Sequence, residues 1–235
     1  MSQEIMGRGP LPNGSPLKTP RAAAVAGIIF SVFLIAALVL VKISVPAHPA
    51  VAGSWLTDSR RRAAAAIGLH LIPFAGIAFL WFIGVLRDRI GEREDRLFAT
   101  VFLGSGVLFV GLLFVAAAIP GGLIADVSPG APGAGTLAVG RNISLILLND
   151  YALRMASVFV LTTVTIARRT KIVPRWLILT GLATALITLV GAGITAWLEL
   201  LFPAWILALS IDILGTSLKA PAGTTGTARA RADGL

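Results

Sequence analysis

The sequence predicts an all-α integral membrane protein, a bundle of about six transmembrane helices with both termini in the cytoplasm. Of its 235 residues, 56% are hydrophobic and only 13% are charged, about half the charged fraction of a soluble domain. Several apolar stretches approach the roughly 20 residues that cross the hydrocarbon core of a bilayer. Lysine and arginine are concentrated in every second connection between these stretches, as they are in the cytoplasmic loops of membrane proteins.

The composition also excludes several classes of function. The chain has no cysteine, which excludes disulfides, thiolate metal sites and thiol catalysis. Its formal charge of +9 fits basic residues at the cytoplasmic ends of membrane helices, so no nucleic-acid partner is expected. No cofactor or metal is expected either, because only one histidine lies within a span and there is no cysteine to join it. The abundance of Arg, Ala and Gly is typical of GC-rich bacteria, which favours a bacterial inner (plasma) membrane.

Hydropathy and flanking charges place the six spans. Residues 1–20 and 216–235 lack an apolar period, so both are expected to be disordered cytoplasmic tails. The spans between them are expected at about residues 22–41, 63–86, 97–119, 143–167, 176–198 and 203–214.

The first two spans have recognisable ends. Arg21 and Lys42 flank the first span. Asp58 or Ser59 is expected to cap the helix of the second. Pro73, inside the second span, is expected to kink it and to free backbone carbonyls.

Glycines predict where helices pack closely. Gly68, Gly76 and Gly84 recur every eight residues in the second span, and Gly104 and Gly111 are seven apart in the third. Such spacings keep the glycines near one helix face, where a neighbouring helix can approach closely.

The second half of the chain is less regular. Residues 120–141, rich in Gly and Pro, are expected to form the longest connection, either a functional lid or a disordered loop. Trp176 and Trp197 end the fifth span as interfacial anchors, and Pro203 suits the first turn of a short sixth helix ending near Leu214. Threonines repeat every four residues in the fifth span, which favours helix packing over a polar pore lining. They are Thr180, Thr184 and Thr188.

The basic residues orient this topology. Fourteen of the 20 lysines and arginines fall on the side of the termini, five fall on the opposite side, and Arg154 lies within a span. The side of the termini is therefore expected to be cytoplasmic.

The fourth span carries the strongest candidate for a site. Asp150 and Arg154 are four residues apart and share a helix face, next to Asn149 and Tyr151. An isolated charge in hydrocarbon is costly, so the acid and the base are expected to pair.

Two further ionisable residues are expected at a similar depth. A rise of 1.5 Å per residue places His70, Asp150, Arg154 and Asp212 in one layer, roughly 10 to 16 Å below the outer boundary. One base between two acids leaves an excess negative charge, so either one carboxyl is protonated or a cation or His70 compensates.

Three functions are compatible with this layer. The first is a transport-like or ligand-sensing polar pocket in the outer half of the bilayer. The second is a noncatalytic structural or assembly subunit, in which the Asp–Arg cluster is a packing staple and the partner is another membrane protein or a second copy. The third is an intramembrane enzyme, in which Ser105 would need His70 as its base. No catalytic residue is assigned, because no Ser–His or metal-binding motif accompanies them.

Overall fold

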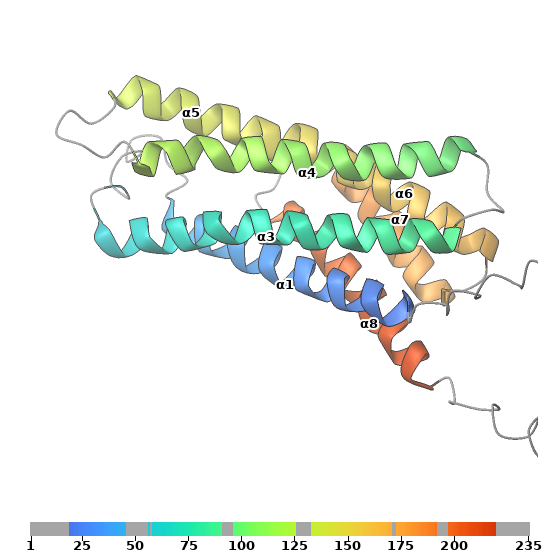
Figure 1. The fold of residues 1–235 in the computed structure, drawn as a ribbon. Coiled ribbons are helices and arrows are strands. Elements are labelled where there is room, and N and C mark those ends of the chain that lie inside the picture. The colour runs from blue at the N-terminus through green and yellow to red at the C-terminus, as the bar shows by residue number, and fades with distance from the viewer. Residues whose placement is uncertain are drawn as a thin grey trace, which may run out of the picture.

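The computed structural model describes residues 19–45, 56, 58–90, 96–125, 133–170, 173–191 and 197–219. Within these ranges every regular element is a helix and there is no strand. Five helices are long and apolar enough to cross a membrane, and a sixth, shorter helix is also apolar. The chain is therefore a multi-pass, all-helical protein, as the sequence predicts (Figure 1).

Nine helical segments follow one another along the described chain. In chain order they are α1 (Thr19–Ser44), α3 (Ser59–Ile90), α4 (Arg96–Ala125), α5 (Ala134–Ile146), the π-helix η3 (Leu147–Ala152), α6 (Leu153–Thr170), α7 (Arg175–Val190), the short η4 (Leu198–Leu200) and α8 (Leu201–Lys219). Helices α5, η3 and α6 run on without a break, and their apolar stretch Gly135–Arg169 is more than long enough to cross a membrane.

The bundle is closed by the first and last helices. Consecutive helices pack against one another, and α8 also packs along α1. The guanidinium of Arg21 donates to the carbonyl oxygen of Ser217 at 3.4 Å. The start of α1 and the end of α8 therefore lie on the same side of the bundle, hereafter the termini side (Figure 1).

Phenylalanines fill the centre of the bundle. Their ring centroids lie 4.4 to 6.4 Å apart, mostly in tilted or edge-on arrangements that stabilise aromatic pairs beyond their burial. They come from α1, α3, α4, α6 and α8 and are Phe30, Phe79, Phe82, Phe102, Phe109, Phe159 and Phe202.

The expectation of one long connection over residues 120–141 is wrong. Helix α4 continues through Pro120 to Ala125, and α5 begins at Ala134. Proline lacks the N–H that would bond to the carbonyl four residues earlier. That carbonyl, on Ala116, accepts instead from Ser144 Oγ of α5 at 2.7 Å. The freed carbonyl thus accepts a hydrogen bond that links α4 to α5. The fourth span begins before the expected residue 143.

The last two helices also differ from the expected spans. Helix α7 has only 16 residues, whereas α8 has 19 and follows directly on η4. The short helix is thus the fifth and not the sixth. The tails expected at 1–20 and 216–235 lie outside the described residues, except that 19–20 belong to α1 and 216–219 to α8.

The glycine prediction holds for α3 only in part and fails for α4. A Cβ on Gly68 would lie 3.0 Å from a backbone oxygen of α1, and one on Gly76 would overlap Phe114 of α4. Gly84, Gly104 and Gly111 have no atom within 4 Å of such a Cβ. Regular spacing predicts that the glycines share one helix face, but it does not predict whether another helix packs on that face.

One local prediction is confirmed and a second holds in part. Asp58 Oδ1 accepts from the backbone N–H groups of Arg60 and Arg61 at 3.0 and 3.2 Å, as expected of an N-cap. The packing prediction for the threonine stripe holds for two of its three members. Thr184 and Thr188 are buried, and Thr188 shares a 2.7 Å hydrogen bond with Ser157 of α6, whereas Thr180 is exposed.

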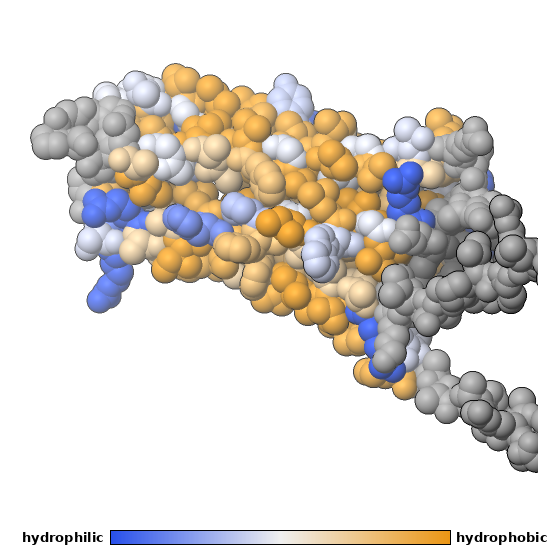
Figure 2. Space-filling model, viewed as in Figure 1, coloured by the Kyte–Doolittle hydropathy of each residue, from blue (hydrophilic) through white to orange (hydrophobic). Residues whose placement is uncertain are grey.

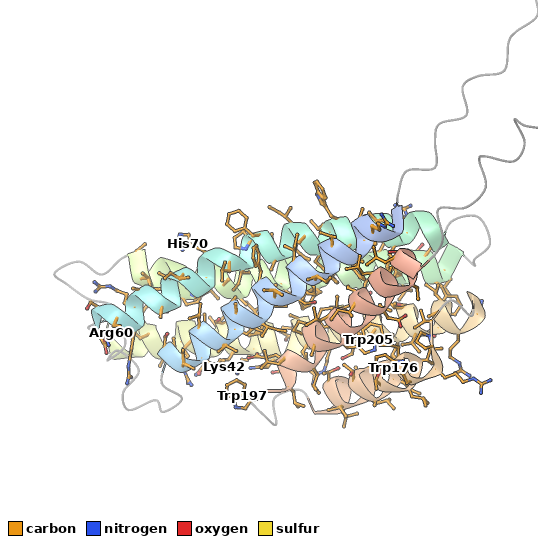
Figure 3. All side chains as sticks on the ribbon, turned by 90° about the horizontal axis from the view of Figure 1, so that it is seen from below. Lys42, Arg60, His70, Trp176, Trp197 and Trp205 are labelled. Carbon is orange, nitrogen blue, oxygen red and sulfur yellow. The ribbon has the colours of Figure 1, made fainter. Side chains whose placement is uncertain are left out.

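The surface suits a membrane along most of its length. Figure 2 shows one face of the molecule, which is largely apolar between charged groups near its two ends. The charged groups at one end include the arginines that begin α3, of which Arg60 is labelled in Figure 3.

Candidate functional site

Asp150 and Arg154 form the expected ion pair. Arg154 Nη1 donates to Asp150 Oδ1 at 2.8 Å and to the carbonyl oxygen of Asp150 at 2.7 Å. The pair is not enclosed in the bundle, because the two side chains are 37% and 41% exposed. Their neighbour Tyr151 is 55% exposed, and Asn149 is half-buried.

The π-helix η3 carries the acidic half of this pair. At its end the Leu153 N–H donates to the Leu148 carbonyl, five residues back, instead of four as in an α-helix. Such wide turns are rare and are frequently found at functional sites. Here the guanidinium of Arg154 donates to a carbonyl oxygen within the wide turn, so the base stabilises the backbone as well as the carboxylate.

The depth of the pair follows from the helix rise. Arg21 lies near the start of α1 and Arg168 near the end of α6, both on the termini side. These two arginines mark one boundary of a hydrocarbon core roughly 30 Å thick. Arg154 is 14 residues from Arg168, roughly 21 Å, so it lies roughly 9 Å inside the opposite boundary. Asp150 lies one turn closer to that boundary. On this estimate Arg154 lies within a hydrocarbon core of that thickness and Asp150 lies about 3 Å inside its edge. Both side chains are on the surface of the bundle.

The structure does not bring the other two expected residues to this pair. His70 is exposed, its Nδ1 lies 2.7 Å from the Ala66 carbonyl of its own helix, and it points away from the bundle (Figure 3). Asp212 lies 13 residues beyond Glu199 on α8, roughly 20 Å towards the termini side. Helix α8 continues to Lys219, beyond the expected end near Leu214, so Asp212 lies in the half of α8 nearer the termini side.

A second ion pair joins the C-terminal end of α1 to η4, the short helix that precedes α8. Lys42 Nζ donates to Glu199 Oε1 at 2.6 Å, and the two side chains are 20% and 5% exposed. The ammonium also lies 5.5 Å from the ring centroid of Trp197, within range of a cation–π attraction. Figure 3 shows Lys42 and Trp197 next to each other where η4 meets α1.

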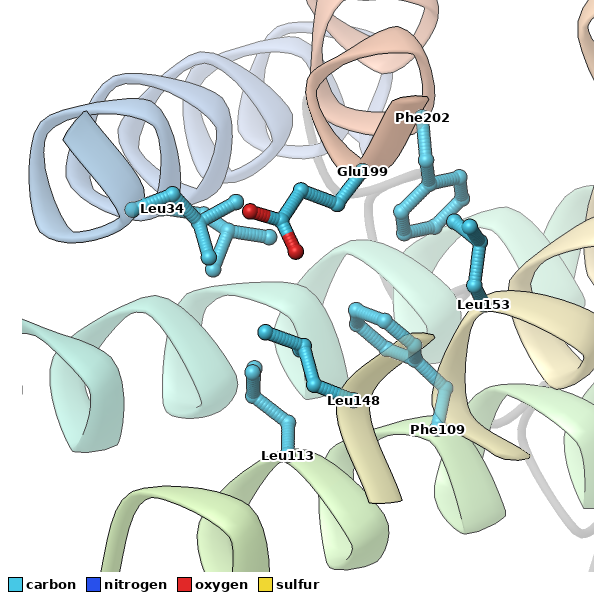
Figure 4. Close-up of a pocket in the computed structure, with 8 residues that line it drawn as sticks. Leu34, Phe109, Leu113, Leu148, Leu153, Glu199 and Phe202 are labelled. Atoms are coloured by element: carbon cyan, nitrogen blue, oxygen red, sulfur yellow. The ribbon is translucent and has the colours of Figure 1, made fainter. Parts of the chain in front are cut away.

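The other oxygen of Glu199 faces a small cavity. Oε2 is buried and has no hydrogen-bond partner among the described residues. The cavity has a volume of about 10 Å³, which is about enough for one water molecule. Figure 4 shows the carboxyl group directed between Leu34 and the side chains of Leu113 and Leu148. Apart from Glu199, its lining is leucine and phenylalanine.

Sequence reasoning missed the Lys42–Glu199 pair. In the sequence, Lys42 flanks the first span, and Glu199 falls between the expected fifth and sixth spans. The six-span topology contained the necessary signal, because the first span ends and the sixth begins on the same side. Two lone opposite charges at those ends are natural partners.

Both sites present charged side chains that can bind polar groups. Among the described residues, no group of three acidic or histidine side chains is placed to hold a metal ion. The buried serine and threonine hydroxyls mostly donate to carbonyls of their own helices, as Ser105 does to Phe102 at 3.1 Å. Both ion pairs can hold helices together or bind polar groups.

No protein-family model, curated protein or solved structure matches the chain.

Proposed function

We propose that the protein is a noncatalytic assembly subunit of a membrane complex, which docks a transmembrane helix against its Asp150–Arg154 pair. The observation that carries the proposal is the position of this pair. It lies at hydrocarbon level, and more than a third of each side chain is exposed on the bundle surface.

Lipid alone is a poor environment for that surface. Charged groups at membrane depth face a bundle interior or a water-filled cavity in almost all membrane proteins, because hydrocarbon offers them no hydrogen bonds. A neighbouring helix with polar side chains would supply the missing bonds. Interhelical hydrogen bonds of this kind contribute roughly 0.6 to 2 kcal/mol each in membranes.

The proposed setting is a bacterial plasma membrane with both termini in the cytoplasm. The excess of lysine and arginine on the termini side supports this orientation. The docking pair would then lie in the outer half of the bilayer.

A ligand-sensing or transport-like site is the second candidate, and it is favoured by Oε2 of Glu199, which has no hydrogen-bond partner in the described part of the chain. A cavity of about 10 Å³ fits a water molecule and not a larger substrate. This candidate therefore predicts a bound water or transferred proton at Glu199, whereas docking predicts a protein partner at Asp150.

Neutralising the docking pair tests the leading proposal. The wild-type protein, extracted in mild detergent, is expected to migrate in native electrophoresis well above the 24.4 kDa of one chain. Combining Asp150→Asn with Arg154→Gln removes the charges that select the partner, so we expect the variant to migrate as a single chain with an unchanged circular dichroism spectrum.

The matched control neutralises an ion pair outside the hydrocarbon level. Arg61 and Asp58 lie 3.5 Å apart and are both about half exposed, and asparagine at position 58 keeps the N-cap. Asp58→Asn with Arg61→Gln should leave the large species intact. A wild-type protein that migrates as a single chain under these conditions contradicts the proposal.

A further inference from the structure

The surface around the docking pair is a continuous stripe along α5, η3 and α6. Val139, Ile143 and Ile146 are 58%, 46% and 46% exposed, and Asp150 and Arg154 follow them. These five residues are spaced by four, three, four and four positions, which keeps them on one helix face.

The polarity of the stripe does not match the membrane depth that the helix rise gives it. Val139 is 29 residues from Arg168, roughly 43 Å, and so lies roughly 13 Å beyond a roughly 30 Å hydrocarbon core, at the level of headgroups and water. Ile146 and Asp150 lie on either side of the edge of this core, and Arg154 lies within it. Exposed apolar groups outside the core and exposed charges at and inside its edge are suited to contact with protein.

The charges on the stripe identify a suitable partner. Asp150 and Arg154 are opposite in charge and one helical turn apart, with no net charge between them. A second copy in the same membrane has the same topology, so its own pair lies at the same depth. A two-fold axis along the membrane normal can then place each carboxylate next to the other copy's guanidinium, as in an isologous interface. No other partner is certain to carry matching charges at this depth.

We propose that two copies of the chain pair through this stripe as a two-fold symmetric dimer, in which Asp150 and Arg154 bind across the interface. This inference rests on the proposed docking function and names its partner. The apolar residues of the stripe then cover one another outside the hydrocarbon core, and the four charges cover one another within it.

Cysteine cross-linking tests the contact directly, because the native chain has no cysteine. Single cysteines at Val139, Ile143 and Ile146 are oxidised in native membranes, where a disulfide needs Cα atoms within about 7 Å. We expect disulfide-linked dimers at one or more of these positions. Trp81→Cys on α3, where the native side chain is 71% exposed, serves as the control and should give none. Absence of dimers at all three stripe positions overturns the inference.

Charge complementation tests the role of the pair. Asp150→Arg makes the site wholly basic and Arg154→Asp makes it wholly acidic, so each variant alone should give at least about tenfold less cross-linked dimer. Two differently tagged copies, one of each variant, should form mixed dimers when expressed together. Failure of two folded variants to form mixed dimers overturns the inference, and the cysteine scan decides if either variant does not fold.

The outcomes also separate this inference from the proposed function. If no stripe cysteine forms a dimer, yet the wild-type protein co-purifies with a different membrane protein that Asp150→Asn with Arg154→Gln releases, docking stands and self-association fails. If the wild-type protein is a single chain and forms no cross-link, both fail.

Discussion

Replacing Lys42 with methionine is expected to lower the free energy of unfolding by about 3 kcal/mol. Glu199 is almost fully buried, and Lys42 supplies the only ion pair of its carboxylate among the described residues. Methionine keeps much of the apolar stem of lysine but leaves a buried charge without compensation. Loss of one partner of a buried pair is costly for that reason.

A double-mutant cycle isolates the interaction. Glu199→Gln removes the buried charge, so Lys42→Met combined with Glu199→Gln should recover most of the lost stability. Unfolding in mixed micelles, followed by circular dichroism, measures all three variants. Arg61→Met, in the exposed pair with Asp58, is the control and should cost less than about 1 kcal/mol. Additive effects of the two single changes would show that the Lys42–Glu199 contact contributes little.

Replacing Gly27 with alanine is expected to destabilise the bundle by about 2 kcal/mol. A Cβ at this position would overlap Ser210 Oγ and lie 2.9 Å from the ring of Phe82. Ser210 is fully buried on α8, so neither its short side chain nor the helix can move away freely. The change therefore forces apart α1 and α8, the contact that closes the bundle.

Gly104→Ala is the matched control for this change. Its Cβ would meet no atom within 4 Å, and alanine favours a helix by up to about 1 kcal/mol over glycine. We expect the control to be neutral or slightly stabilising in the same unfolding assay. Gly27→Ala combined with Ser210→Gly should recover part of the loss, because the nearest clash is removed. Equal stability of the Gly27→Ala and Gly104→Ala variants would contradict the close approach of α1 and α8.

The membrane class and most of the helices could be predicted because hydrophobic length and flanking charge act locally. Arg21 and Lys42 each lie two residues inside an end of α1. Asp58 caps α3 through hydrogen bonds from the N–H groups of Arg60 and Arg61. The extent of α4 could not be predicted in this way. Pro120 reads as a break in sequence, and the carbonyl that it frees is satisfied by Ser144, a residue 28 positions away.

The same distinction applies to the candidate sites. The Asp150–Arg154 pair is visible in sequence because its members are one helical turn apart. The expected layer with Asp212 depended on where α8 begins and ends, and its true extent moves Asp212 towards the termini side. The Lys42–Glu199 pair joins residues far apart in the sequence. The order of the spans places both residues on the same side of the membrane, but only the packing of α8 along α1 brings them into contact.

Photo-cross-linking at Tyr151 tests most directly whether protein covers the Asp150–Arg154 surface. This side chain is exposed beside Asp150, and a benzophenone amino acid in its place preserves an aromatic ring. Trp81 on α3, which is more exposed still, is the control position. In native membranes we predict a discrete protein adduct from position 151 and lipid adducts alone from position 81. Lipid adducts alone from both positions would contradict the account.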